Sequence, residues 1–401
     1  MIESISFVLF DPGIPIGGTK GASVHVKNLS EAFARLGIRV RLYATSVVGT
    51  APVGVELIHL PFETAAPKGV LGEVVKLRES IRFTQSIRAL ESGDPSDLYY
   101  ERLSLFFGNG SGIVNGTGAL RLIEVNAPVS KERYEHFGLE MQLEAEDAER
   151  SALAGADAIA VSESTAQHAL SMGARSATVI PNGVDLVAFA LASKSSRAVI
   201  RNELGISDAE FVVGFVGSLK PWHGVQRLLD ALRDLSPSQS LTLLLVGDGP
   251  MRESLLKSAS LLPSSLNVVF AGAQASERIP SFFSAMDVSV APYEPNDDFY
   301  FSPLKVVESL AAGVPVIAAD FEPIRRIAGE SAIYFEPGST SGLTSSIIKA
   351  IKNNDFRNLI AASGKVRTQN MGWDDVAQKI LGHTALIGRN TSVVPSRRCE
   401  K

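Results

Sequence analysis

Short, uninterrupted apolar runs separated by longer amphipathic stretches dominate this sequence. In residues 241–246, for example, only one threonine interrupts leucine and valine, without the polar alternation of a half-exposed strand. Continuous apolar strands are typical of parallel sheets that helices cover on both faces. The runs predict strands at 5–10, 38–44, 55–60, 97–101, 120–125, 157–161, 176–180, 211–217, 241–247, 267–271, 287–291, 314–319 and 332–335.

The stretches between these runs have the periodicity of amphipathic helices. Val26, Leu29 and Phe33 recur on one helical face, and Gly37 follows as a stop signal. Strands that alternate with helices predict an α/β fold. Because this alternation of strands and helices is interrupted once, we expect two doubly wound, Rossmann-like domains.

The break in the strand pattern lies near 187–207. We therefore expect domains at 1–187 and 188–387. The last helix, at about 374–387, can pack on either domain. Residues 388–401 lack periodicity and are expected to form a tail.

Charge and composition exclude several classes of protein. The 401 residues carry 38 basic and 43 acidic side chains, a formal charge of −5, and 45% are hydrophobic. Such a chain is not disordered, and it lacks the basic excess that a nucleic-acid partner usually requires. The single cysteine, Cys399, excludes an internal disulfide. The run at 5–10 has no basic leader and no run reaches about 20 apolar residues, so we expect a cytoplasmic protein without a membrane span.

A glycine-rich turn follows the first predicted strand. It contains Gly17, Gly18 and Gly21 and leads into a helix. Glycines let a backbone approach a ligand closely, and a helix N-terminus presents free N–H groups to an anion. The dinucleotide pattern G-x-G-x-x-G is absent. A ligand-binding turn and a plain connector both remain open.

Two further turns follow strands of the second domain. One runs from Gly217 to Gly224 and contains Lys220 and His223, and the other is centred on Gly247. A lysine can bind a phosphate group through the point charge of its ammonium. Alternatively, the histidine only closes the loop, and the second turn only connects a strand to a helix.

The segment 301–318 has the richest pattern. Ser302 is a candidate N-cap and Pro303 a candidate first helical residue. Lys305 and Glu308 are three residues apart, so they lie near one another on one helical face. A helix start with a lysine suits a diphosphate, and a carboxylate one turn on suits a ribose diol. The alternative is a solvated ion pair.

Taken together, these segments resemble family 4 glycosyltransferases of the GT-B fold. The resemblance covers roughly residues 10–320. The matching segments are 17–21 with His25, 124–128, 161–164, 180–185, 217–224, 247–250 and 302–318.

The resemblance implies two Rossmann-like domains that face each other across a cleft, the first for the acceptor and the second for a UDP- or GDP-linked sugar. It implies no metal and no further cofactor, and no Asp-x-Asp dyad occurs on a convincing turn. Asp297 and Asp298 are adjacent instead, in a loop that is expected to be solvated or to contact sugar. The residues it assigns to the donor are Gly17, Gly18, Ser218, His223, Gly247, Ser302, Pro303, Leu304 and Glu308. Those it assigns to the acceptor are Lys20, His25 and Glu124, and those it assigns to catalysis are Lys220, Lys305 and Asn126.

The sequence departs from the family pattern at several positions. Family members commonly have two glutamates that flank seven residues; Glu308 matches the second, but Tyr300 stands at the first. Ser218 and His223 stand where an arginine and a lysine are common. Asn126 stands where some relatives have a histidine near the acceptor. The donor sugar is therefore left open.

The resemblance predicts a retaining glycosyltransferase that moves a sugar to a sugar, lipid-linked or small-molecule acceptor, in the synthesis of cell-surface polysaccharide, glycolipid or glycoconjugate. The protein would be a monomer or a homodimer. Two rivals stay open, a nucleotide-sugar epimerase and a non-catalytic nucleotide-sugar-binding subunit. A dehydrogenase is a weaker rival. The predicted helix at 74–90 carries four cations, which are Lys76, Arg78, Arg82 and Arg88. They allow two interpretations, a weak peripheral contact with the inner face of the cytoplasmic membrane or a solvated helix face.

Overall fold

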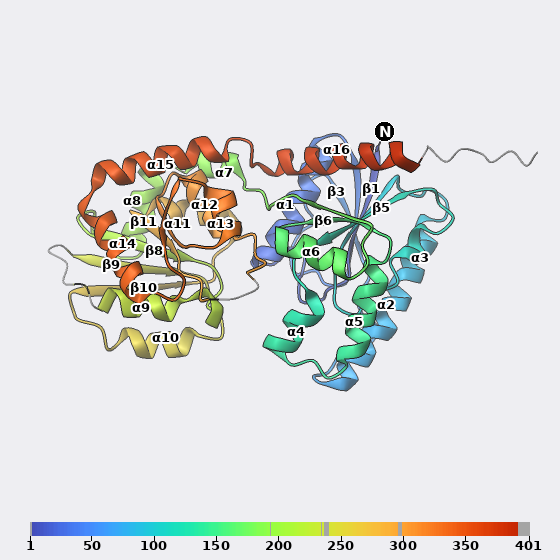
Figure 1. Ribbon diagram of the computed structural model, residues 1–401, viewed down its shortest axis with the longest axis horizontal. Coiled ribbons are helices and arrows are strands. Elements are labelled where there is room, and N and C mark those ends of the chain that lie inside the picture. Colours follow the sequence, from blue (N-terminus) through green and yellow to red (C-terminus); the bar gives the residue numbers. More distant parts are fainter. Residues whose placement is uncertain (1, 193, 234, 236–239, 296–298, 392–401) are drawn as a thin grey trace, which may run out of the picture. The chain divides into compact units, whose positions relative to one another are not determined.

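The computed structural model describes residues 2–192, 194–233, 235, 240–295 and 299–391 (Figure 1). Its contacts divide the chain into two compact units. The first contains the chain up to Gly18, His25–Pro181 and the last helix, and the second contains Thr19–Val24 and Asn182–Gly372. The sequence places its boundary near 187 and leaves the last helix open between the domains.

The first unit is built on a parallel sheet in the order β3-β2-β1-β4-β5-β6-β7. In its centre Phe7 lies between Leu42 and Tyr100, and all three are fully buried. The strands are β1 (Ser4–Leu9), β2 (Arg39–Ala44), β3 (Val55–His59), β4 (Leu98–Arg102), β5 (Leu120–Val125), β6 (Asp157–Ala160) and β7 (Ser176–Val179).

Helices connect these strands in the manner of a doubly wound fold. Val26, Leu29 and Phe33 of the first helix are fully buried, as their spacing predicts. The helices are α1 (Gly21–Arg35), α2 (Val70–Glu91), α3 (Ser111–Val114), α4 (Val129–Phe137), α5 (Gln142–Leu153), α6 (Glu163–Ser171) and α16 (Trp373–Thr391).

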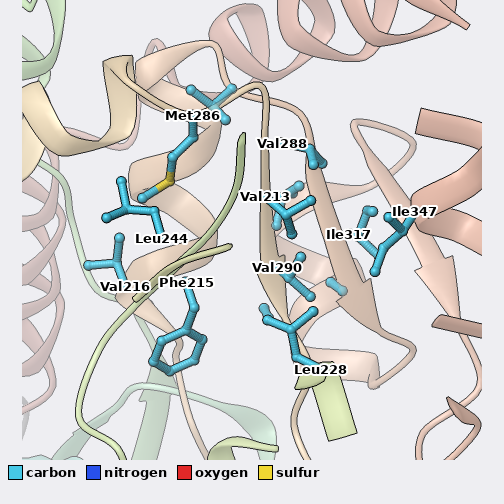
Figure 2. Packing of buried hydrophobic residues seen from close by; sticks show 14 of the residues in the cluster. Val213, Phe215, Val216, Leu228, Leu244, Met286, Val288, Val290, Ile317 and Ile347 are labelled. Atoms are coloured by element: carbon cyan, nitrogen blue, oxygen red, sulfur yellow. The ribbon is translucent and has the colours of Figure 1, made fainter. Parts of the chain in front are cut away.

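The second unit has a parallel sheet in the order β10-β9-β8-β11-β12-β13. Figure 2 shows its core, in which strand side chains such as Val213 and Val290 lie with Leu228 and Ile347 from two helices. The strands are β8 (Phe211–Val216), β9 (Leu241–Val246), β10 (Leu266–Gly272), β11 (Val288–Ala291), β12 (Val316–Ala319) and β13 (Ala332–Phe335).

The helices of the second unit complete its layers. They are α7 (Leu186–Leu191), α8 (Lys194–Glu203), η1 (Pro221–His223), α9 (Val225–Arg233), α10 (Arg252–Ala259), η2 (Ser276–Arg278), α11 (Ile279–Ser284), α12 (Leu304–Ala312), α13 (Glu322–Ala328), α14 (Thr340–Lys352) and α15 (Asn354–Thr368).

The predicted α/β fold with two doubly wound sheets is confirmed, and every predicted strand is present. One prediction at the C-terminus is wrong, because α16 continues through 388–391, where the sequence predicts a tail. Glycine and polar residues weaken a terminal helical turn without preventing it. The rest of that tail, 392–401, lies outside the described residues, as do Asp297 and Asp298.

A buried carboxylate fixes α2 to the first sheet. Glu91, which is 2% exposed, accepts hydrogen bonds from Ser6 of β1, Arg41 of β2 and Tyr99 of β4, at 2.8, 2.8 and 3.0 Å. Burial alone would raise the pKa of Glu91, but these and other bonds, above all that from Tyr43, hold it below its usual range. Glu91 is therefore charged and fully partnered.

We expect Glu91→Ala to lower the free energy of unfolding by about 3–5 kcal/mol, because it leaves the buried donors of Arg41, Tyr43 and Tyr99 without the acceptor that they share. Urea denaturation of the full chain measures this. Glu253→Ala is the matched control, since Glu253 is 84% exposed in its pair with Lys257 and should change stability by less than about 0.5 kcal/mol. Equal effects of the two substitutions would contradict the role assigned to Glu91.

Candidate functional site

The topology of the second unit directs ligands to one position. From β8 the chain proceeds through β9 to β10 on one side, and β11, β12 and β13 follow on the other side. The order therefore reverses between β8 and β11, and in open parallel sheets ligands bind beyond the carboxyl ends of the strands at such a switch point. Of the predicted donor residues, Ser218 and His223 follow β8, Ser302 and Pro303 follow β11, and Gly247 follows β9.

Two glycine turns pack together at these strand ends. Gly217, with φ +142°, and Gly247, with φ +138°, have backbone conformations that other residues rarely adopt. A Cβ atom on Gly247 would lie 1.9 Å from the carbonyl oxygen of Gly217. A Cβ atom on Gly217 would lie 3.1 Å from Cε of Lys305. Glycine thus lets the lysine side chain lie directly on the turn.

The ammonium group of Lys305 is buried without a hydrogen-bond partner among the described residues. The residue is 8% exposed, and its Nζ lies 4.3 Å from the ring centroid of Phe215 and 4.5 Å from that of Tyr293. Aromatic faces attract a cation but accept no conventional hydrogen bond from it. Burial lowers the pKa of Lys305 to about 7, although the charge of Glu308 opposes this. The alternative of a solvated ion pair is therefore wrong.

Glu308 complements this lysine one helical turn along α12. Burial raises the pKa of Glu308 to about 7, with Lys305 opposing the shift. Each of the two groups is thus held away from its ordinary charge state near neutral pH. An anion bound at Lys305 would favour the charged ammonium, and hydroxyl groups bound at Glu308 would favour the charged carboxylate.

The imidazole of His223 closes the loop after β8. Its Nδ1 lies 2.5 Å from the carbonyl oxygen of Ser218. Burial, followed by the charge of Lys305, lowers the pKa of His223 to about 2, and Ser218 only partly opposes this. The ring is therefore neutral at physiological pH. Lys220 lies on the same loop, with Nζ 4.7 Å from the ring centroid of Trp222.

The start of α12 differs from the prediction. Pro303, not Ser302, is the N-cap, and Leu304 is the first helical residue. The hydroxyl oxygen of Ser302 accepts a hydrogen bond of 3.1 Å from the backbone N–H of Asn182, and its carbonyl accepts one of 3.0 Å from the Asn182 amide. The side chain of Ser302 thus bonds to the 182 loop, and among the described residues no side chain caps this helix.

Of the predicted acceptor residues, His25 and Glu124 lie in the first unit, whereas Lys20 belongs to the segment Thr19–Val24 of the second. His25 of α1 and Glu124 of β5 are 3% and 2% exposed, and His25 Nε2 lies 2.5 Å from Glu124 Oε1. Arg102 lies 3.2 Å from the other carboxylate oxygen. Burial alone would raise the pKa of Glu124, but His25 and Arg102 hold it at about 2. The ring of His25 packs edge-on against Trp373, at 5.0 Å.

The other predicted residues of this half lie around the same strand ends. The amide nitrogen of Asn126, directly after β5, is buried, and the Asn126 side chain adds to the interactions that lower the pKa of Glu124. Gly17 lies against the backbone of Gly49, and Gly18 donates a hydrogen bond to Pro15 in a turn. Lys20 directly precedes α1. The glycine turn therefore has a packing role of its own.

Sequence reasoning missed four residues of these sites. Phe215 and Tyr293 contact Lys305, Asn182 holds Ser302, and Arg102 pairs with Glu124. Three of them end a strand or closely follow one, which is the only local signal they offer. Their partners are distant in the chain, so the contacts depend on the fold.

Residues 210–353 match the family model of glycosyl transferases group 1. Over 214 residues the chain is 27% identical to a D-inositol 3-phosphate glycosyltransferase of Rhodococcus jostii, covering 51% of this chain and 46% of that protein. It is 30% identical over 213 residues to a GDP-mannose-dependent alpha-mannosyltransferase of Mycobacterium tuberculosis, covering 52% and 51%. The chain spans about half the length of the curated relatives it matches.

Solved structures extend the likeness to both domains. A sucrose-phosphate synthase from Thermosynechococcus elongatus has a TM-score of 0.76 at 20% identity, covering 97% of this chain and 100% of that one. Anabaena HepE in complex with UDP-glucose has a TM-score of 0.72 at 20% identity, covering 96% and 99%. At such identities the likeness shows the fold, and it confirms the two Rossmann-like domains of a GT-B chain.

The described residues contain no helix long and apolar enough to cross a bilayer, and no group of three or more histidine, cysteine or acidic side chains arranged to hold a metal ion. On α2, two of the cations in the stretch considered for membrane contact pair with a buried carboxylate. Arg78 and Arg82 lie 3.0 and 2.7 Å from oxygens of Glu79, which is fully buried.

We expect Lys305→Met to raise the free energy of unfolding by about 1–3 kcal/mol in the absence of ligand, because it removes a buried donor that finds no acceptor in the described part of the chain. Urea denaturation at pH 7 measures this. The gain should shrink as the pH rises from about 7 toward 10.5. The pKa of Lys305 is lowered from 10.5 to about 7 by folding, so over this range only the unfolded chain still binds the proton.

Arg201→Met is the matched control. Arg201 is 1% exposed, but it donates to the carbonyl of Ala285 and to Asp287, at 3.0 and 2.8 Å. Loss of this partnered cation should lower stability by about 3–5 kcal/mol. If Lys305→Met lowers stability in the same way, the ammonium of Lys305 has a structural role.

Proposed function

We propose that the protein is a glycosyltransferase that takes its sugar from a nucleoside-diphosphate donor bound by the second domain. The observation that carries this proposal is the buried ammonium of Lys305 at the switch point of the sheet, for which the described residues offer no hydrogen-bond partner. A diphosphate supplies the acceptor oxygens and the negative charge that this group lacks. The family match over 210–353 supports the same reading.

In this proposal each group of the second domain has a separate task. Lys305 and Lys220 stabilise the negative charge that develops on the departing diphosphate. Glu308 accepts hydrogen bonds from the two ribose hydroxyls. The turns at Gly217 and Gly247 allow the donor to approach the backbone closely.

We place the acceptor at the strand ends of the first domain. Lys20, His25 and Asn126 would contact the acceptor there, and Glu124 would orient His25 through their 2.5 Å contact. We further propose that transfer retains the anomeric configuration and needs no assigned protein nucleophile. UDP-linked and GDP-linked sugars are the donors to test first. Anabaena HepE binds UDP-glucose, and the mycobacterial relative is named for GDP-mannose.

A thermal-shift screen of the full chain with UDP, GDP and ADP tests the proposal and identifies the base, since a ligand that binds the native state raises the melting temperature by mass action. Glu308→Gln should lower nucleotide affinity about tenfold to a hundredfold, because a hydrogen bond to a charged group contributes roughly 1.5–3 kcal/mol. Nucleotides that lack both ribose hydroxyls should be insensitive to it. Lys305→Ala should weaken the diphosphate much more than the nucleoside.

The proposal fails if no nucleoside diphosphate or nucleotide sugar binds. The assignment of Lys305 and Glu308 fails if both variants fold and bind the nucleotide as well as the wild type does. Glu294→Gln is a useful control for Glu308→Gln. It also changes a carboxylate of the second domain, but one bonded to Arg227 rather than placed for ribose.

We expect transfer activity to persist in excess chelator, because this proposal assigns diphosphate stabilisation to Lys220, Lys305 and backbone N–H groups. The measurement is product formation from the identified donor, with and without a chelator. Complete loss of activity that magnesium or manganese restores would show that a divalent cation does this work instead.

A further inference from the structure

His223 is held in one orientation by contacts on several sides. Its ring lies edge-on to Tyr293 at 5.4 Å and to Trp222 at 6.1 Å. Nδ1 contacts the Ser218 carbonyl, and the Trp222 carbonyl accepts a 3.1 Å hydrogen bond from the backbone N–H of Glu294. The loop and the ring are therefore fixed before any ligand binds.

The contact with Ser218 determines which ring nitrogen bears the hydrogen. A backbone carbonyl only accepts hydrogen bonds, so Nδ1 must be the donor. The ring is neutral, so Nε2 then has a lone pair and no hydrogen. In the part of the chain that the structure describes, no group forms a hydrogen bond with Nε2, and Nε2 is not one of the fully buried polar atoms that lack a partner.

This lone pair cannot serve a phosphate. Ionised phosphate oxygens only accept hydrogen bonds, so they would repel Nε2. Yet His223 lies beside the proposed diphosphate site, because its ring and the ammonium of Lys305 both contact Tyr293. The ligand group that Nε2 suits must therefore bear a hydrogen, and the groups of a nucleotide sugar that do so next to the diphosphate are the hydroxyls of the ribose and of the sugar.

We propose that Nε2 of His223 accepts a hydrogen bond from a hydroxyl group of the transferred sugar. This rests on the proposed function, which gives the ribose hydroxyls to Glu308. His223 is then a specificity-determining residue that favours the intact donor over the bare nucleoside diphosphate. Lys305 and Lys220 bind the diphosphate group, which the intact donor and the bare nucleoside diphosphate share.

The test compares each nucleoside diphosphate with its sugar derivative, using UDP with UDP-glucose or GDP with GDP-mannose, whichever pair binds the wild type. Isothermal titration gives both affinities for the wild type and for His223→Asn. Asparagine keeps an N–H near the position of Nδ1 to bond with Ser218, but it has no atom at Nε2. His223→Asn should reduce the preference for the sugar derivative about threefold to tenfold and leave diphosphate affinity unchanged.

A series of donors that each lack one sugar hydroxyl completes the cycle. One member should bind the wild type about threefold to tenfold more weakly than the full donor, yet bind His223→Asn equally well. Equal losses of diphosphate and sugar-derivative affinity in His223→Asn would overturn the inference and indicate a phosphate or loop role. Unchanged affinities would also overturn it. Failure of the wild type to bind any nucleoside diphosphate or nucleotide sugar would instead overturn the proposed function.

Discussion

Burial of both faces of two parallel sheets is the constraint on which this molecule depends. Every central strand is hidden, so polar chemistry is confined to the strand ends and to the few buried groups that find partners. The order of the strands then determines at which strand ends a ligand can bind. In the second domain the reversal between β8 and β11 brings Gly217, His223 and Lys305 to one place, although Lys305 is distant from the other two in the sequence.

Buried charges in this protein fall into two kinds. Glu91 and Arg201 are surrounded by donors and acceptors that satisfy them, and each fixes a helix to the body of its domain. Lys305 has aromatic faces and a glycine turn around it, and among the described residues no acceptor. Burying a cation in that way costs stability, and a fold retains such a group more readily when a ligand completes it. Whether a buried charge has hydrogen-bond partners therefore distinguishes a structural charge from a candidate ligand-binding charge better than burial itself does.

The sequence predicted the strands well because a continuous apolar run is a local property of the residue order and does not depend on distant partners. It also indicated His223, which follows a strand end, Lys305, which lies at a helix start, and Glu308, which is three residues from Lys305. It could not predict the contact of Lys305 with Tyr293, the bond between Ser302 and Asn182, or the tautomer of His223, because these depend on partners that only the fold brings together. The misplaced cap at Ser302 has the same origin, since capping preference is local and the competing bond is not.

The departures from the family pattern acquire a physical meaning in this setting. A lysine at the position of His223 would add a second cation beside Lys305, whereas a neutral imidazole adds an acceptor without charge repulsion. Ser218 contributes through its carbonyl, which fixes the hydrogen on Nδ1. The loop after β8 is thereby divided between charge, supplied by Lys220, and directional acceptance, supplied by His223. Because a hydrogen bond discriminates between ligand groups more sharply than a point charge does, this division would, in the proposed function, shift the loop from holding the diphosphate toward recognising the sugar.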